Sequence, residues 1–171
     1  GFNLKGPVAR ATVRFTIRPA PLAADVPGVY TPPVIGPRFQ PVLDQAVEIE
    51  AEGFSRQDGG QAGVCEKIGA SGKALKLWDK PDQVLEWTFD LPRSALCAIQ
   101  VRCCHDSPDP VVRQIRIDGA PFGGPDAALL FPPTGGWSNT RDDWRSVWVT
   151  IQGTAVTMDL VAGPHTLTFV N

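Results

Sequence analysis

The stretch VLEWTFD (84–90) alternates apolar and polar residues, so Leu85, Trp87 and Phe89 fall on one side of an extended chain. Such alternation is typical of a strand with one face buried and one face in water. The pattern recurs in ATVRFTIR (11–18) and VEIEAE (47–52). Further strands are predicted in KALKLW (73–78), CAIQVRC (97–103), RQIRID (113–118), VWVTIQ (147–152), AVTMDL (155–160) and HTLTFV (165–170).

About nine short strands and no amphipathic helix predict an all-β domain. Because each strand has one wet face, we expect a β-sandwich of two antiparallel sheets. Residues 19–46 contain seven of the 17 prolines and predict an extended linker or a strap lying against the sandwich. We therefore divide the chain into residues 1–18, an N-terminal strand; 19–46, the proline-rich segment; and 47–171, the sandwich.

Composition excludes several functions. The net charge of −2 gives no broad basic field for nucleic acid or an anionic membrane surface, and no apolar run is long enough to span a bilayer. Two histidines, no GxSxG motif and no recognisable Cys–His spacing predict that the chain is not an enzyme. Four cysteines without a CxxC spacing argue against zinc. Buried thiols are favoured slightly over a disulfide.

The segment TGGWSNTRDDW (134–144) places two tryptophans in a polar run. An indole ring can stack on the apolar face of a sugar, and nearby polar groups can bind its hydroxyls. Trp137 and Trp144 are therefore candidates for stacking, although they could equally cap the core. Asn139, Arg141, Asp142 and Asp143 are candidates for polar contacts. Arg141 also suits a carboxylate, which gives a slight preference for acidic sugars.

EIEAE (48–52) places Glu48, Glu50 and Glu52 on one face of the predicted strand. These carboxylates could bind a hard cation such as calcium. From spacing alone, a solvated sheet face is the simpler interpretation.

In order and spacing, VEIEAEGFS, GKALKLWDKPDQVLEWTFDLP, CAIQVRCC, RQIRIDGAPF, PTGGWSNTRDDW and VTMDLVAGPHTLTFVN resemble the carbohydrate-binding modules of families six and thirty-five. The resemblance covers residues 47–171 and implies a jelly-roll, galactose-binding-like sandwich. It implies a secreted or extracellular, non-catalytic module attached to a carbohydrate-active enzyme. It also implies a structural calcium at Glu50 and Glu52 and an aromatic platform at Trp137.

Two features depart from that family. The loops after the first strand lack the second aromatic platform, for which Trp78 is a partial substitute. The family's final strand, with an Asn-x-Asp motif, is absent after Asn171, but GFNLKGPVARATVRFTI at the N-terminus resembles it. We therefore hypothesise a circularly permuted sandwich, in which Asn3 contacts sugar and Lys5 replaces the calcium-binding aspartate. The alternatives are that residues 1–18 end a preceding domain, and that the sandwich is a structural or assembly domain that binds no sugar.

Overall fold

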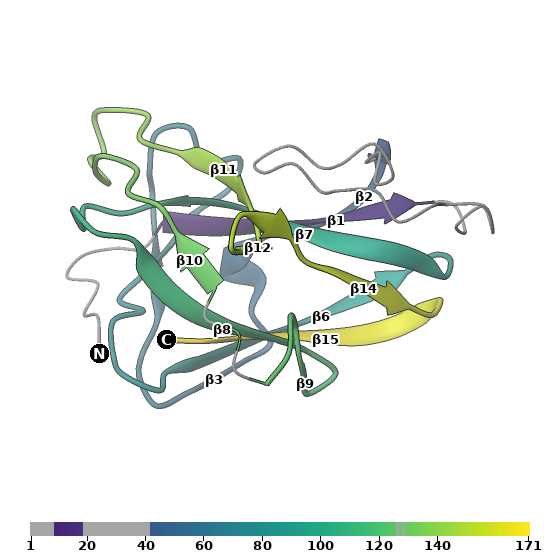
Figure 1. Cartoon of the computed structure of the whole chain (residues 1–171). Helices are drawn as coiled ribbons and strands as arrows, with labels where there is room; N and C mark the ends of the chain where they lie inside the picture. Colours follow the sequence, from purple (N-terminus) through teal and green to yellow (C-terminus); the bar gives the residue numbers. More distant parts are fainter. Residues whose placement is uncertain (1–8, 19–41, 126, 128) are drawn as a thin grey trace.

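The computed structural model describes residues 9–18 and 42–171, except for residues 126 and 128 (Figure 1). Its strands form two antiparallel sheets packed into a β-sandwich, as predicted. The five-stranded sheet contains β1 (Ala9–Arg18), β2 (Val42–Ile49), β7 (Ala95–Cys104), β11 (Arg145–Trp148) and β14 (Thr157–Leu160). The six-stranded sheet contains β3 (Arg56–Asp58), β6 (Val84–Leu91), β8 (Val111–Ile117), β9 (Ala120–Pro121), β10 (Leu129–Phe131) and β15 (Gly163–Val170). Two hairpins pair β4 (Gly63–Cys65) with β5 (Ala74–Lys76), and β12 (Thr150–Ile151) with β13 (Thr154–Ala155).

Strand β7 organises the five-stranded sheet. It pairs with β1 along one edge, and with β11 and then β14 along the other. Strand β1 also pairs with β2, so residues 9–18 lie inside the sheet and not beside it. The prediction that the proline-rich segment extends to residue 46 is wrong, because residues 42–46 belong to β2. Residues 19–41 lie outside the described part of the chain.

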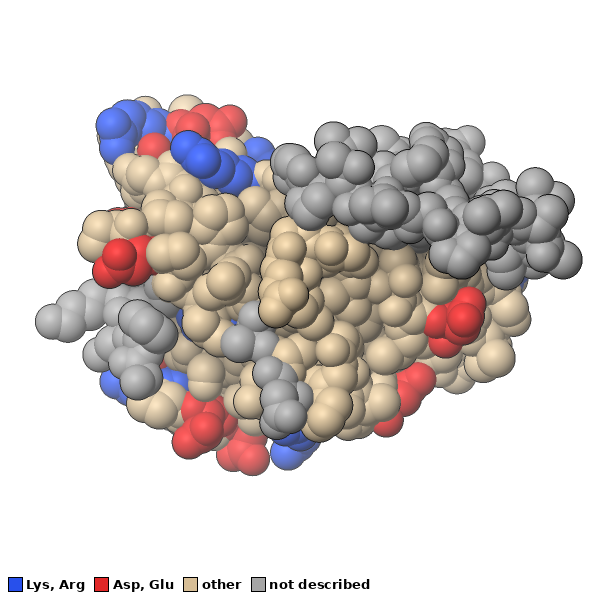
Figure 2. All heavy atoms as spheres, in the orientation of Figure 1, with Lys and Arg blue, Asp and Glu red and all other residues tan. Residues whose placement is uncertain are grey.

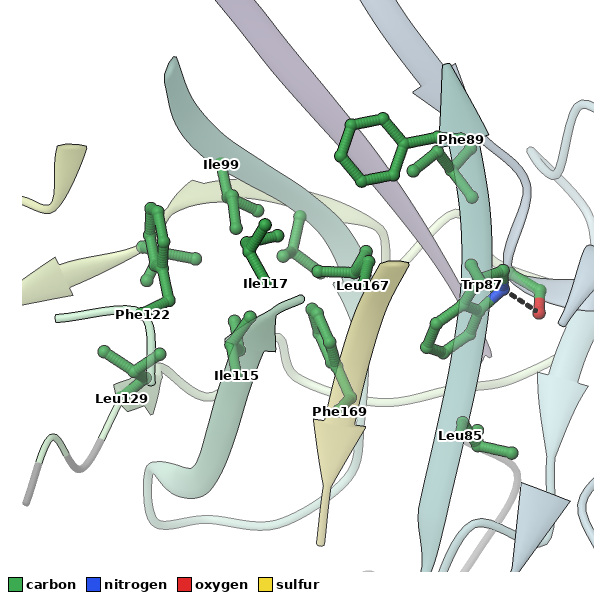
Figure 3. Close-up of a cluster of buried hydrophobic side chains, with 14 of the residues drawn as sticks. Leu85, Trp87, Phe89, Ile99, Ile115, Ile117, Phe122, Leu129, Leu167 and Phe169 are labelled. Atoms are coloured by element: carbon green, nitrogen blue, oxygen red, sulfur yellow. Dashed lines mark hydrogen bonds between the residues drawn. The ribbon is translucent and has the colours of Figure 1, made fainter. Parts of the chain in front are cut away.

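The core lies between the two sheets, where the alternating residues of facing strands meet. Strand β6 buries Leu85, Trp87, Phe89 and Leu91, as its sequence pattern predicts. Figure 3 shows the core side chains of both sheets, with Trp87 directing its indole nitrogen toward a backbone oxygen. That hydrogen bond runs from Trp87 Nε1 to the Ala51 carbonyl oxygen, at 3.1 Å.

Two predicted strands have different bounds from those expected. Strand β2 ends at Ile49, and Ala51–Gly53 forms a 3₁₀ turn, η1, so Glu50 and Glu52 do not share a strand face with Glu48. The strand predicted over 147–152 is divided at Val149, whose N–H donates to the Ile99 carbonyl. The chain then turns at Gln152 and Gly153, both with positive φ, as in a two-residue hairpin loop.

None of the four cysteines forms a disulfide, and Cys97, Cys103 and Cys104 are buried thiols, as the sequence favours, while Cys65 is partly exposed. Burial raises the pKa of Cys97 to about 11 and that of Cys103 to about 12, so both remain protonated near neutral pH. Among the described residues, no helix is both long and apolar enough to cross a membrane.

Candidate functional site

The tryptophan loop, residues 134–144, connects β10 to β11 and is attached to the end of β7 through His105. The Gly136 N–H donates to the His105 carbonyl at 3.1 Å, and the His105 N–H donates to Thr134 Oγ1 at 2.8 Å. Gly135 and Gly136 have φ angles of 91° and 149°, which glycine adopts readily. Trp137 follows this attachment directly, so its backbone starts from a fixed position.

A buried lysine holds the second half of the loop. Lys67 Nζ donates to the Ser138 carbonyl at 2.7 Å and to the Arg141 carbonyl at 3.2 Å. It also lies 3.8 Å from Asp143 Oδ2. The side chain of Lys67 is 2% exposed and that of Asp143 is 10% exposed. Asp143 also accepts a hydrogen bond from the Ser138 N–H at 3.0 Å, so its carboxylate helps to hold the loop together.

Trp144 has a full set of contacts within the protein. Its Nε1 donates to the Ile68 carbonyl at 2.9 Å. Arg102 Cζ and Lys67 Nζ lie 4.8 Å and 5.6 Å from its ring centroid, within cation–π distance. Arg102 Nη1 also donates to the Gly69 carbonyl at 2.7 Å. Trp144 thus joins the 66–70 segment to β7, which corresponds to the packing alternative for this residue.

Trp137 packs in the same small cluster as Trp144. Both rings are half-buried and pack, with Cys65, on the buried side chains of Ala74 and Cys104. Unlike Trp144, Trp137 makes no side-chain hydrogen bond or cation–π contact among the described residues. Asn139 is exposed, and the Arg141 side chain is 68% exposed, with its Nε 3.6 Å from Asp143 Oδ1. Figure 2 shows basic and acidic side chains gathered at the end of the molecule where Figure 1 places the loop before β11. The loop therefore combines a partly accessible ring with an exposed amide and an exposed guanidinium.

One expected ligand contact does not join this group, and another falls outside the described residues. Trp78 is only 4% exposed, packs against Phe169 and donates its Nε1 hydrogen to the Gln83 carbonyl, so its ring belongs to the core. The prediction that it supplies stacking surface is wrong for this physical reason. Asn3 and Lys5 lie outside the described residues.

Glu50 and Glu52 converge on the segment from Ser71 to Lys73. Glu50 Oε1 accepts a hydrogen bond from Ser71 Oγ at 2.7 Å, and Glu52 Oε1 accepts one from the Lys73 N–H at 2.6 Å. Glu52 Oε2 is buried and has no hydrogen-bond partner among the described residues. A buried carboxylate oxygen in this state fits a cation, and oxygen donors fit calcium. The described part of the chain contains no cluster of three or more acidic, histidine or cysteine residues around it.

Sequence reasoning missed Lys67, Arg102 and His105, which hold the loop. Each acts mainly on backbone carbonyls or rings that are distant in sequence, and such contacts leave no local motif. The Gly-Gly before Trp137 was the one visible signal, since it indicated a tight turn.

Comparison with solved structures gives the class of fold. A family 35 carbohydrate binding module from Clostridium thermocellum aligns with a TM-score of 0.52 at 15% identity, over 67% of this chain and 78% of that chain. CBM35 from Cellvibrio japonicus Abf62 aligns at 0.46 and 18% identity, over 70% and 75% of the two chains. A β-1,3-glucan binding CBM6 from Bacillus halodurans aligns at 0.43 and 25% identity, over 71% and 92%.

No protein-family model and no curated protein matches the sequence. Only the first TM-score exceeds 0.5, and at 15% identity it establishes the fold without the ligand. The chain therefore has a sandwich fold similar to that of a family 35 carbohydrate-binding module, in agreement with the resemblance seen in the sequence.

Proposed function

We propose that this chain is a non-catalytic carbohydrate-binding module whose ligand stacks on Trp137. The observation that carries the proposal is a half-buried indole on a loop fixed at both ends, by His105 and by Lys67. A ring held in this way loses little conformational freedom when a sugar binds. We further propose that the module belongs to a larger extracellular carbohydrate-active protein, as the likeness to family 35 supports.

Asn139 and Arg141 are the proposed polar contacts beside that ring. Both are exposed, and neither is enclosed by the loop as Asp143 is. Arg141 offers a planar set of donors that matches a carboxylate, so we propose that an acidic sugar residue binds more tightly than its neutral counterpart. Trp144 and Asp143 shape the loop in this proposal and do not contact the ligand.

The test is a calorimetric titration with neutral and uronic-acid oligosaccharides. We expect saturable binding, weakened about tenfold or more by Trp137→Ala, which corresponds to about 1.4 kcal/mol. Arg141→Ala should weaken binding of acidic ligands more than neutral ones. Leu130→Ala, at an exposed apolar position on β10, is the matched control and should leave affinity unchanged.

A folded protein that binds no oligosaccharide would contradict the proposal. The alternative is then a structural or assembly domain that makes protein–protein contacts through the same fold. Light scattering of the parent and of Trp137→Ala distinguishes the two, because an assembly surface centred on Trp137 would give an oligomer that the variant loses.

We also propose that a cation, calcium, balances Glu50 and Glu52. The buried Oε2 atom of Glu52 supports this proposal. Calcium at 100 times its dissociation constant should stabilise the fold by about 2.7 kcal/mol, measured as a higher melting temperature that a chelator reverses. Glu52→Gln should abolish the effect, while Glu66→Gln, at an exposed carboxylate, should keep it.

The competing hypothesis places the Lys5 ammonium in the same site. In that case the melting temperature of the parent protein would not respond to calcium or to chelator. Lys5→Met would lower it, and calcium would then restore it.

A further inference from the structure

His105 has one ring nitrogen whose role the geometry assigns and one that is unsatisfied. Nε2 lies 2.9 Å from the Pro132 carbonyl oxygen, which can only accept, so Nε2 carries the proton. Nδ1 is then a lone-pair acceptor, and it is buried with no hydrogen-bond partner among the described residues. The side chain is buried, and its backbone is the attachment point of Thr134 and Gly136.

Arg113 on β8 supplies the charge near this imidazole. It is buried, with Cζ 4.6 Å from the Trp78 ring centroid and Nη1 donating to the Val112 carbonyl at 2.6 Å. Its Nη2 is also buried without a hydrogen-bond partner in the described part of the chain. No described carboxylate forms an ion pair with it. An unprotonated Nδ1 is therefore compatible with this guanidinium, whereas a protonated one adds a second buried cation.

The other groups around His105 do not neutralise the second buried positive charge that protonation would add. Cys103 remains a neutral thiol, and the neighbouring Asp106 is exposed, where water weakens its attraction. Phe131, the last residue of β10, and Pro132, which follows it, present backbone groups. Burial, the largest effect, and the Arg113 charge lower the pKa of His105 below its ordinary value, although the backbone groups of Pro132 and Phe131 and the Asp106 charge partly oppose the shift.

We propose that His105 is the positioning residue of the Trp137 platform, and that it holds the tryptophan loop in place only as a neutral imidazole. Protonation at Nδ1 creates a buried positive N–H donor that has no acceptor among the described residues, so it drives the ring toward water. Because the His105 backbone bonds to both Thr134 and Gly136, that movement displaces Trp137. The consequence for affinity rests on the proposed function, and the coupling between His105 and Trp137 does not.

The test uses NMR on the free protein, in which the only two histidines are His105 and His165. His165 serves as an internal control, because its pKa is shifted in the opposite direction to that of His105. Burial opposes its protonation, but the hydrogen bond from its Nδ1 to Asp118 Oδ2 at 2.7 Å raises its pKa above the ordinary value. His165→Gln assigns the ring signals, and loss of one indole N–H signal in Trp137→Phe assigns Trp137.

We expect the Trp137 indole signal to shift with the midpoint of His105, below the ordinary value near 6.5, and not with that of His165. His165→Gln should retain the shift. His105→Gln should lose it, because glutamine can still donate to the Pro132 carbonyl but takes no proton. Below the His105 midpoint, sugar binding should weaken as the pH falls, and the logarithm of the dissociation constant should rise by up to about one for each pH unit of decrease.

A Trp137 signal that ignores the His105 midpoint in the parent protein would overturn the proposal, whether or not the glutamine variant folds. A shift that persists in folded His105→Gln would also overturn it. If the Trp137 indole signal shifts with the His105 midpoint but no oligosaccharide binds, the coupling stands and the proposed sugar-binding function fails.

Discussion

Replacing Trp87 with alanine should lower the free energy of unfolding by about 3 to 5 kcal/mol, a large part of the stability of a domain of this size. Trp87 lies in the middle of β6, is almost fully buried and meets Phe169 of β15 edge-on at a centroid distance of 5.7 Å. Alanine leaves a cavity between the sheets that neighbouring strands cannot close, because their backbones are fixed by pairing. Urea unfolding followed by circular dichroism measures the loss.

The alanine variant also removes the hydrogen bond from Trp87 Nε1 to the Ala51 carbonyl, and a phenylalanine variant separates the two effects. Trp87→Phe keeps most of the ring but leaves that carbonyl unpaired, so we expect a loss of about 1 to 3 kcal/mol. Val161→Ala, at an exposed apolar position, is the control and should change stability by about 0.5 kcal/mol or less. Equal losses in Trp87→Ala and Val161→Ala would contradict the core described above.

The strands that bury one face were predictable because burial with a period of two leaves a direct imprint on sequence. Residues 84–90 and 97–103 needed no information about distant parts of the chain. The end of β2 was not predictable in this way. Ala51 is fully buried and continues the alternation, but it is buried by a 3₁₀ turn beneath Trp87 and not by a strand.

The place of residues 9–18 was predictable only through the resemblance. Alternation in 11–18 indicates a strand, but pairing with both β2 and β7 joins segments far apart in the chain. Loop closure between them leaves no local pattern. Strand β1 lies where a strand completing the sandwich is required, and the permuted order relative to families six and thirty-five stays a hypothesis that Asn3 and Lys5 variants address.

The sequence predicts the tryptophan loop as the candidate site, but only the structure identifies the residues that hold this loop in place. Lys67 is separated by 71 residues from Ser138 and by 74 from Arg141, the two residues whose carbonyls it binds. A lysine in a short polar segment is ordinarily solvated, and nothing in residues 60–72 indicates that this one is buried. Pattern reasoning therefore identified Trp137 as the candidate ring and missed the buried lysine that holds its loop.

Replacing that charge is the second substitution with a large expected effect. Lys67→Met keeps the length of the side chain but leaves Asp143 without its buried cation and two carbonyls without their donor. Breaking a buried pair from one side typically costs about 3 to 5 kcal/mol. Arg141, whose Nε lies 3.6 Å from Asp143, offsets part of this, so we expect a loss of about 3 kcal/mol in chemical unfolding. The sugar affinity of Lys67→Met should fall, as it does in Trp137→Ala.

Lys80→Met is the matched control, because Lys80 pairs with Asp79 at 3.7 Å but is 63% exposed. Water screens that pair, and its loss should change stability by about 1 kcal/mol or less. Adding Asp143→Asn to Lys67→Met should recover part of the loss, since a neutral amide oxygen can still accept from the Ser138 N–H without a buried charge. Strict additivity of the two substitutions, or a Lys67→Met protein as stable as Lys80→Met, would mean that the loop is held by its attachment to His105 alone.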